Sequence, residues 1–174
     1  MRNSMFRPVL LVLVAGLAAC GGASSETAEK AAEAPVIEET PQAYREYAAQ
    51  LRHEGKHQEA ADAALKAFTL ARSGPRVDER IELAKAFGAG GNSAGAINEI
   101  KELEGLKRDG EIQLDEVVIA EVYAQIGDPN AVFRWLDRAI AANSPNVAAI
   151  ETNEDLKPVH DDPRWPDIVT ASKQ

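Results

Sequence analysis

The chain has 174 residues, of which 45% are hydrophobic, 27% charged and 5% aromatic, so it is long enough for one small domain with a modest core. Its 28 acidic residues outnumber its 19 basic residues, which argues against a partner recruited by negative charge, such as nucleic acid or an anionic membrane surface. Cys20 is the only cysteine, so an intramolecular disulfide is excluded, and one cysteine with three scattered histidines does not assemble a Cys/His zinc cluster.

Residues 1–19 have the pattern of an export signal. Arg2 and Arg7 supply positive charge, and an apolar run of 11 residues follows from Val9 to Ala19. A helix that crosses a bilayer needs about 20 apolar residues, so this run is too short to span one. We therefore expect a signal peptide that ends before residue 20.

The signal ends in Leu17-Ala18-Ala19-Cys20, which resembles the lipobox of bacterial lipoproteins. The resemblance implies cleavage before Cys20 and attachment of palmitate-type acyl chains, each buried CH2 of which adds about 0.8 kcal/mol of membrane affinity. In Gram-negative lipoproteins an aspartate after the cysteine favours the inner membrane, so Gly21 implies the periplasmic face of the cell outer membrane if the host is Gram-negative. The alternative is an ordinary secretory signal that contains a cysteine near its end.

Residues 20–40 form the next segment and read as a flexible, acidic tether. Five glutamates and many small residues surround Val36 and Ile37, the only large apolar residues of the segment. Such a composition buries too little apolar surface to fold. A flexible chain of this length reaches about 25 Å, which would hold the following domain clear of the lipid headgroups.

A pattern of small and apolar residues then occurs three times between residues 41 and 144, each copy 36 residues after the last, in segments 41–74, 75–110 and 111–144. A glycine at one fixed phase, with apolar residues at helical spacing on both sides, predicts two antiparallel helices joined by a tight turn in each copy. We expect helices at 41–54, 57–72 and 75–89, a fourth that Asn92 or Ser93 caps and that ends near 106, and two more at 113–126 and 129–143. Thr40 before Pro41 and Asp128 before Pro129 are the expected caps of the first and the last of these helices. The positions in register are Ala48, Ala84 and Ala120; Leu51, Phe87 and Tyr123; Gly55, Gly91 and Gly127; Ala60, Ala96 and Val132; Ala64, Ile100 and Leu136; and Ala67, Leu103 and Ala139.

This spacing resembles the tetratricopeptide repeat (TPR) family, whose unit is about 34 residues long. Tyr44 stands where that family prefers tryptophan, although Arg80 and Glu116 stand there in the later copies. The resemblance implies an all-α fold, a short right-handed α-solenoid of three TPR-like hairpins. The alternative is an ordinary helical bundle in which the spacing arose by chance.

Residues 145–174 resemble the segment that often closes proteins of this family. We expect Asp162 to cap and Pro163 to start a short helix that ends near Ala171 and turns Trp165, Ile168 and Val169 toward the third repeat. A closing segment of this kind covers the apolar face that an open stack of repeats exposes.

The resemblance also implies a concave groove lined by the first helix of each repeat. Its basic members would form a positive patch suited to an acidic segment or a C-terminal carboxylate. The competing interpretation is that these bases pair with Glu46, Glu54 and Glu82 nearby. The implied groove positions are Gln42, Arg45, Ala49, Arg52 and His53; Asp78, Ile81 and Lys85; and Leu114, Val117, Glu121 and Gln125.

No catalytic motif occurs in residues 20–174, and His53 with His57, or His160 with Asp161 and Asp162, make poor metal sites. The sequence therefore predicts no enzyme, no metal and no cofactor other than covalent lipid on Cys20. It indicates a lipid-anchored envelope lipoprotein that binds a protein partner through a TPR groove, with no nucleic acid and no small-molecule substrate. The alternative is a self-associating scaffold lipoprotein that supports cell-wall or outer-membrane assembly.

Overall fold

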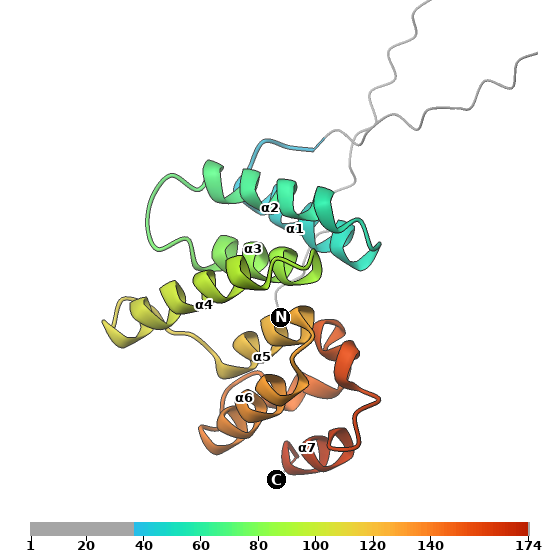
Figure 1. Ribbon diagram of the computed structural model, residues 1–174. Helices are drawn as coiled ribbons and strands as arrows, with labels where there is room; N and C mark the ends of the chain where they lie inside the picture. The colour runs from blue at the N-terminus through green and yellow to red at the C-terminus, as the bar shows by residue number, and fades with distance from the viewer. Residues whose placement is uncertain (1–36, 174) are drawn as a thin grey trace, which may run out of the picture. The chain divides into compact units, whose positions relative to one another are not determined.

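The computed structural model describes residues 37–173, which are helical throughout their regular structure and contain no strand (Figure 1). The all-helical architecture expected from the sequence is confirmed. The predicted signal peptide, Cys20 and the tether as far as Val36 lie outside the described residues. No helix in the described part of the chain is both long enough and apolar enough to span a membrane. The elements are α1 (Pro41–His53), α2 (His57–Leu70), α3 (Val77–Ala89), α4 (Ser93–Arg108), α5 (Glu116–Ile126), α6 (Pro129–Ala141), the 3-10 helices η1 (Val147–Thr152) and η2 (Glu154–Val159), and α7 (Trp165–Ala171).

Side-chain caps fix the start of several helices. The Thr40 hydroxyl accepts a hydrogen bond from the Ala43 amide at the start of α1, and the Asp128 carboxylate accepts one from the Ala131 amide at the start of α6. In both helices proline occupies the first turn, where its missing N–H costs nothing. These two predicted caps are confirmed.

The first helix of each pair ends at the same kind of glycine turn. Gly55, Gly91 and Gly127 have φ angles of 76°, 80° and 79°, in the left-handed region that glycine adopts without strain. At each turn the amide after the glycine donates to the carbonyl five residues back: Lys56 to Leu51 at 2.9 Å, Asn92 to Phe87 at 2.8 Å and Asp128 to Tyr123 at 3.1 Å. Because this pattern satisfies the free carbonyls of a helix end, the three glycines occupy equivalent bends, as the sequence register predicted.

The helices pack in consecutive pairs, α1 with α2, α3 with α4 and α5 with α6, and α3 also contacts both α1 and α5 (Figure 1). Small residues at the seam let the paired helices come close. Three positions that are in register and at most 2% exposed grow bulkier along the chain: they hold Ala48, Ala60 and Ala64 in the first pair, Ala84, Ala96 and Ile100 in the second, and Ala120, Val132 and Leu136 in the third.

The C-terminal segment packs on the last helix pair, but its final helix begins later than predicted. α7 starts at Trp165, and Pro166 supplies its early proline. Asp162 does not cap it; its carboxylate accepts from the amide and guanidinium of Arg164 in a local turn. Trp165 and Ile168 are buried in the core of the third pair, with Val169 partly buried against it, as expected.

Two other helices also begin later than the sequence suggested. α3 begins at Val77 because Arg76 has a φ of 50°, which is not helical. α5 begins at Glu116 because the Asp115 carboxylate accepts from the Val117 amide and caps the helix there.

Candidate functional site

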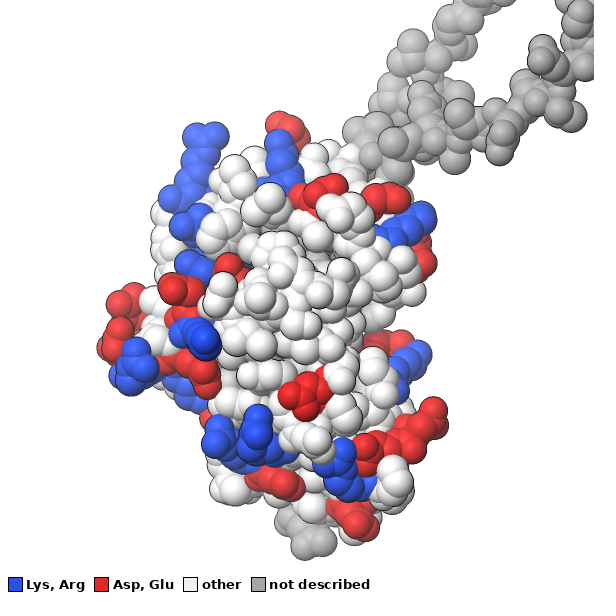
Figure 2. Space-filling model, in the orientation of Figure 1, with Lys and Arg blue, Asp and Glu red and all other residues white. Residues whose placement is uncertain are grey.

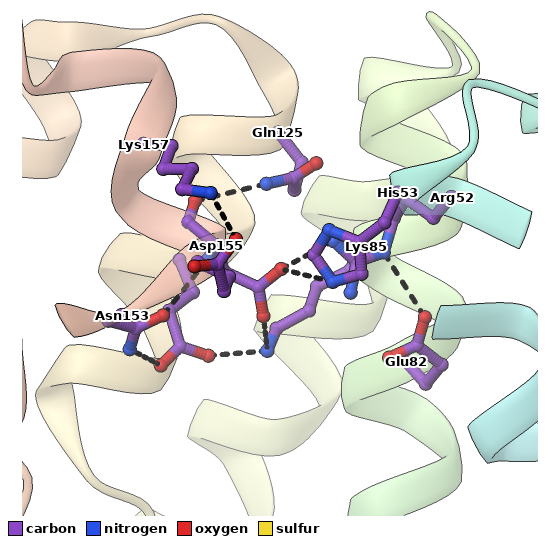
Figure 3. Close-up of polar contacts among 10 residues, drawn as sticks. Arg52, His53, Glu82, Lys85, Gln125, Asn153, Asp155 and Lys157 are labelled. Atoms are coloured by element: carbon purple, nitrogen blue, oxygen red, sulfur yellow. Dashed lines mark hydrogen bonds and ion pairs between the residues drawn. The ribbon is translucent and has the colours of Figure 1, made fainter. Parts of the chain in front are cut away.

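Charged side chains from α1, α3, α5 and η2 meet in one buried network (Figure 3). Arg52 on α1 is 5% exposed, and Lys85 on α3 is 8% exposed. Glu82 and Glu121 are equally buried. Asp155 comes from η2, and its side chain is 14% exposed.

Asp155 lies at the centre of the network and contacts the first helix of each pair, α1, α3 and α5. One carboxylate oxygen accepts from Arg52 Nη1 at 2.5 Å, and the other accepts from Lys85 Nζ at 2.7 Å. Its backbone carbonyl accepts from the Gln125 side chain on α5 at 3.0 Å. A single residue of the C-terminal segment is thus bound through its side chain and its main chain together (Figure 3).

The two cations also bind carboxylates that are fixed on the helices. Arg52 Nε donates to Glu82 Oε1 at 3.2 Å, and Lys85 forms a second ion pair with Glu121. The Asn153 side chain donates to Glu121 at 2.7 Å and accepts from the Asp155 amide at 3.0 Å. Among the described residues, no buried side-chain nitrogen or oxygen of this network lacks a hydrogen-bond partner, as a buried network requires.

Burial and pairing pull the pKa values of the network in opposite directions. Burial raises the pKa of Asp155, but the charges of Lys85 and Arg52 outweigh this effect and hold that pKa below its ordinary value of 3.8. Burial also lowers the pKa of Lys85, yet Glu121 and Asp155 more than compensate and the pKa is raised. For Glu82, burial dominates and its pKa is raised. At neutral pH the contact between Asp155 and Lys85 is a charged one.

Four residues that the sequence assigned to a groove belong to this network: Arg52, Lys85, Glu121 and Gln125. His53 lies at its edge, with Nε2 3.9 Å from Asp155 and 47% of its side chain exposed. The predicted basic patch is therefore neutralised within the chain at Arg52 and Lys85. The competing interpretation is confirmed for the pair of Arg52 with Glu82.

The remaining predicted groove positions are divided between surface and core. Arg45 binds Asp78 and Glu79, each at 3.1 Å, and Gln42 donates to Glu46. Glu54 pairs with Lys56 rather than with a groove base. Two positions are corrected: Leu114 and Val117 are buried in the cores of the second and third helix pairs, so their side chains offer no surface to a partner.

A cleft of about 270 Å³ remains open between α1 and α3. Glu82 lines this cleft and also binds Arg52, so the cleft meets the buried network at Glu82. A second hollow of about 630 Å³ continues along α1 and shares Arg45 and Glu46 with it. The lining residues of the first cleft are Arg45, Glu46, Ala49, Asp78, Ile81 and Glu82.

The face drawn in Figure 2 carries most of its charged side chains toward the edges of the helical unit. Within residues 37–173, no three histidine, cysteine, aspartate or glutamate side chains gather as a metal site would require. His160, named above as a weak metal candidate, stacks on Trp165 with ring centroids 4.3 Å apart. The candidate functional site in the described chain is therefore the buried ion-pair network around Asp155, together with the cleft beside it.

Comparison with protein-family models, curated proteins and solved structures gave no match to this chain. The described residues define a class by their own geometry: an all-helical protein of consecutive helix pairs, with a buried ionic network on the helices that begin each pair.

Proposed function

We propose that the protein is a lipid-anchored adaptor of the bacterial envelope, which binds a protein partner in the cleft between α1 and α3 and performs no chemical turnover. Its helical part is a short right-handed solenoid of three TPR-like hairpins with a closing C-terminal segment. Cys20 carries the lipid, and the tether of residues 20–40 holds the hairpins away from the membrane, on the periplasmic face of the outer membrane.

The observation that carries this proposal is the open cleft between α1 and α3, which lies beside the Asp155 network, whose charges are paired within the chain. The lining of the cleft combines the apolar Ala49 and Ile81 with charged side chains such as Arg45 and Asp78, a mixture that suits an extended peptide better than a small molecule. The equivalent glycine bends support a repeat architecture, which presents such surfaces on successive first helices.

Site-specific photocrosslinking in cells tests the cleft. A photoreactive amino acid at Ala49 should give an adduct of one discrete mass, because Ala49 lines the cleft. The matched control is Leu65 on α2, which is 51% exposed and outside the cleft, and it should not give that adduct. The same adducts from both positions, or none from Ala49, would refute the cleft as the binding surface. An adduct with the mass of two copies of this chain would instead support the self-associating scaffold.

Replacement of Cys20 tests the anchor separately. Cys20→Ser removes the thiol that the lipid requires, so the protein should move from the membrane fraction to the soluble fraction of the envelope. Retention of the variant in membranes would contradict lipid anchoring. The matched variant Ser24→Ala, in the same segment, should leave the protein in the membrane fraction.

A further inference from the structure

We propose that Arg52 and Lys85 form a carboxylate-binding site for an acidic segment of the partner. Asp155 occupies this site in the structure, and this arrangement is the closed form of the chain. This inference rests on the proposed adaptor function and names the chemistry that the groove recognises. Asp155 is then a ligand supplied by the chain itself. A partner segment that replaces it must offer the same groups, a carboxylate and a main-chain carbonyl.

The contacts of Asp155 are those by which a groove recognises a peptide. Two cations from different helices hold its carboxylate, and Gln125 from a third helix binds its main-chain carbonyl. Any aspartate or glutamate in an extended or 3-10 segment offers the same two groups. The following residue, Leu156, is completely buried, so an apolar residue after the acid completes the pattern.

Of the three carboxylates in the network, Asp155 is the one that a partner could replace, because it is not carried by one of the paired helices. Within the described residues, Arg52 and Lys85 face three carboxylates, two of which are fixed on helices at Glu82 and Glu121. Asp155 instead belongs to a segment that follows the last helix pair. Exchange of its carboxylate for one from a partner leaves the charge of the network unchanged, so the exchange carries no electrostatic penalty of its own.

The open cleft gives a partner a route to this site. Glu82 lines the cleft and binds Arg52, which also binds Asp155, so a segment lying between α1 and α3 would reach the edge of the network at Glu82. Displacement of Asp155 would join the cleft to the buried site and lengthen the groove.

Apolar contacts keep the closed form dominant in the free chain. Ile150, Leu156 and Val159 are buried in the core of the last helix pair, and they hold η2 near the site at a high effective concentration. A free peptide competes poorly with such a tethered segment. A variant that removes the Asp155 carboxylate should therefore bind an added acidic peptide better than the native chain does.

A binding measurement with a defined probe tests this expectation. The probe is a fluorescent synthetic peptide with the sequence of residues 150–160, and fluorescence anisotropy reports its binding to the full chain. We expect Asp155→Ala to bind the probe at least tenfold more tightly than the native chain. The gain should be lost when Lys85→Met is added, and when the probe carries asparagine in place of its aspartate. Equal binding by the native chain and folded Asp155→Ala, or equal binding of a shuffled probe, would overturn the proposal.

Hydrogen exchange on the native chain gives a second test that needs no variant. Excess probe should speed exchange of the amides of residues 153–159, because the probe releases η2 from the site. Unchanged exchange at saturating probe would also overturn the proposal. The Ala49 crosslink does not involve Arg52 or Lys85, so its result separates a failure of this inference from a failure of the adaptor function.

Discussion

Arg45 and Arg52 lie two turns apart on α1, yet their side chains meet different surroundings. Arg52 is buried between Glu82 and Asp155, whereas Arg45 keeps 27% of its side chain exposed and pairs with the exposed Asp78 and with Glu79, whose side chain is 13% exposed. A buried ion pair that loses one member leaves an uncompensated charge in a medium of low polarity. A solvent-exposed pair that loses one member is rehydrated at little cost.

We therefore expect Arg52→Ala to lower the free energy of unfolding by about 3–5 kcal/mol, measured by urea denaturation. Arg45→Ala is the matched control, and its cost should stay below about 1 kcal/mol. Comparable losses from the two variants would contradict the buried network. Because of this difference, charge reversal at Arg52 does not report on partner binding alone, while reversal at Arg45 does.

The pH dependence of Asp155 follows from the direction of its pKa. Its folded-state pKa lies below the ordinary 3.8, so the ionised carboxylate stabilises the folded chain above pH 3.8, and this contribution is lost as the pH falls through the folded-state value. The difference in unfolding free energy between the native chain and Asp155→Asn should thus be constant near neutral pH and shrink below pH 3.8. Urea titrations at several pH values check this. The pKa of Glu82 is raised and acts in the opposite sense, but Glu82 is present in both proteins. A difference that grows in acid would be inconsistent with a charged Asp155.

At the scale of elements, the close approach of α3 to α5 depends on one glycine. A methyl group on Gly88 would lie 3.1 Å from the Ile126 amide nitrogen and 3.2 Å from the Gln125 side chain. Gly105 in α4 has room, because its nearest neighbour would be the end of the flexible Arg108 side chain at 3.7 Å. Alanine favours a helix over glycine equally at both positions, so packing decides the sign of the effect.

Gly88→Ala should therefore lower the unfolding free energy by about 1–3 kcal/mol, the usual cost of overpacking. Gly105→Ala should raise it by about 0.5–1 kcal/mol through helix propensity. Thermal denaturation followed by circular dichroism distinguishes the two. Stabilisation of both variants would contradict the close approach of α5 to Gly88 on α3.

The elements that the sequence predicted well are those set by local chemistry. Thr40, Asp128 and the three turn glycines act on backbone groups within a few residues of themselves, so the pattern along the chain is sufficient to find them. The Asp155 network was not foreseen, because the contact with Arg52 joins residues 103 positions apart. The resemblance to the repeat family placed Arg52 and Lys85 in the groove, but no nearby residue indicated that Asp155 of the same chain supplies the carboxylate that both of them bind.

At the scale of the whole helical unit, the C-terminal segment completes the core of the last helix pair. Ile150, Leu156 and Trp165 pack there against Val117 and Val132. Deletion of residues 145–174 would expose that apolar surface and remove Asp155 from Arg52 and Lys85 at the same time. We expect the truncated chain to lose cooperative thermal unfolding and to bind a hydrophobic dye strongly. A truncated chain that unfolds at the native midpoint would show instead that the segment is dispensable for the fold.

The change in seam volume from the first helix pair to the third has a consequence for mutational tolerance. Ala48 and Ala64 are fully buried, so added atoms would have to displace their neighbours and enlargement should be the damaging change there. Val132 and Leu136 are larger and just as buried, so trimming them would leave a cavity and should be the damaging change. A saturation screen of buried sites would then record a preference for small residues at one end of the domain that reverses to a preference for bulk at the other.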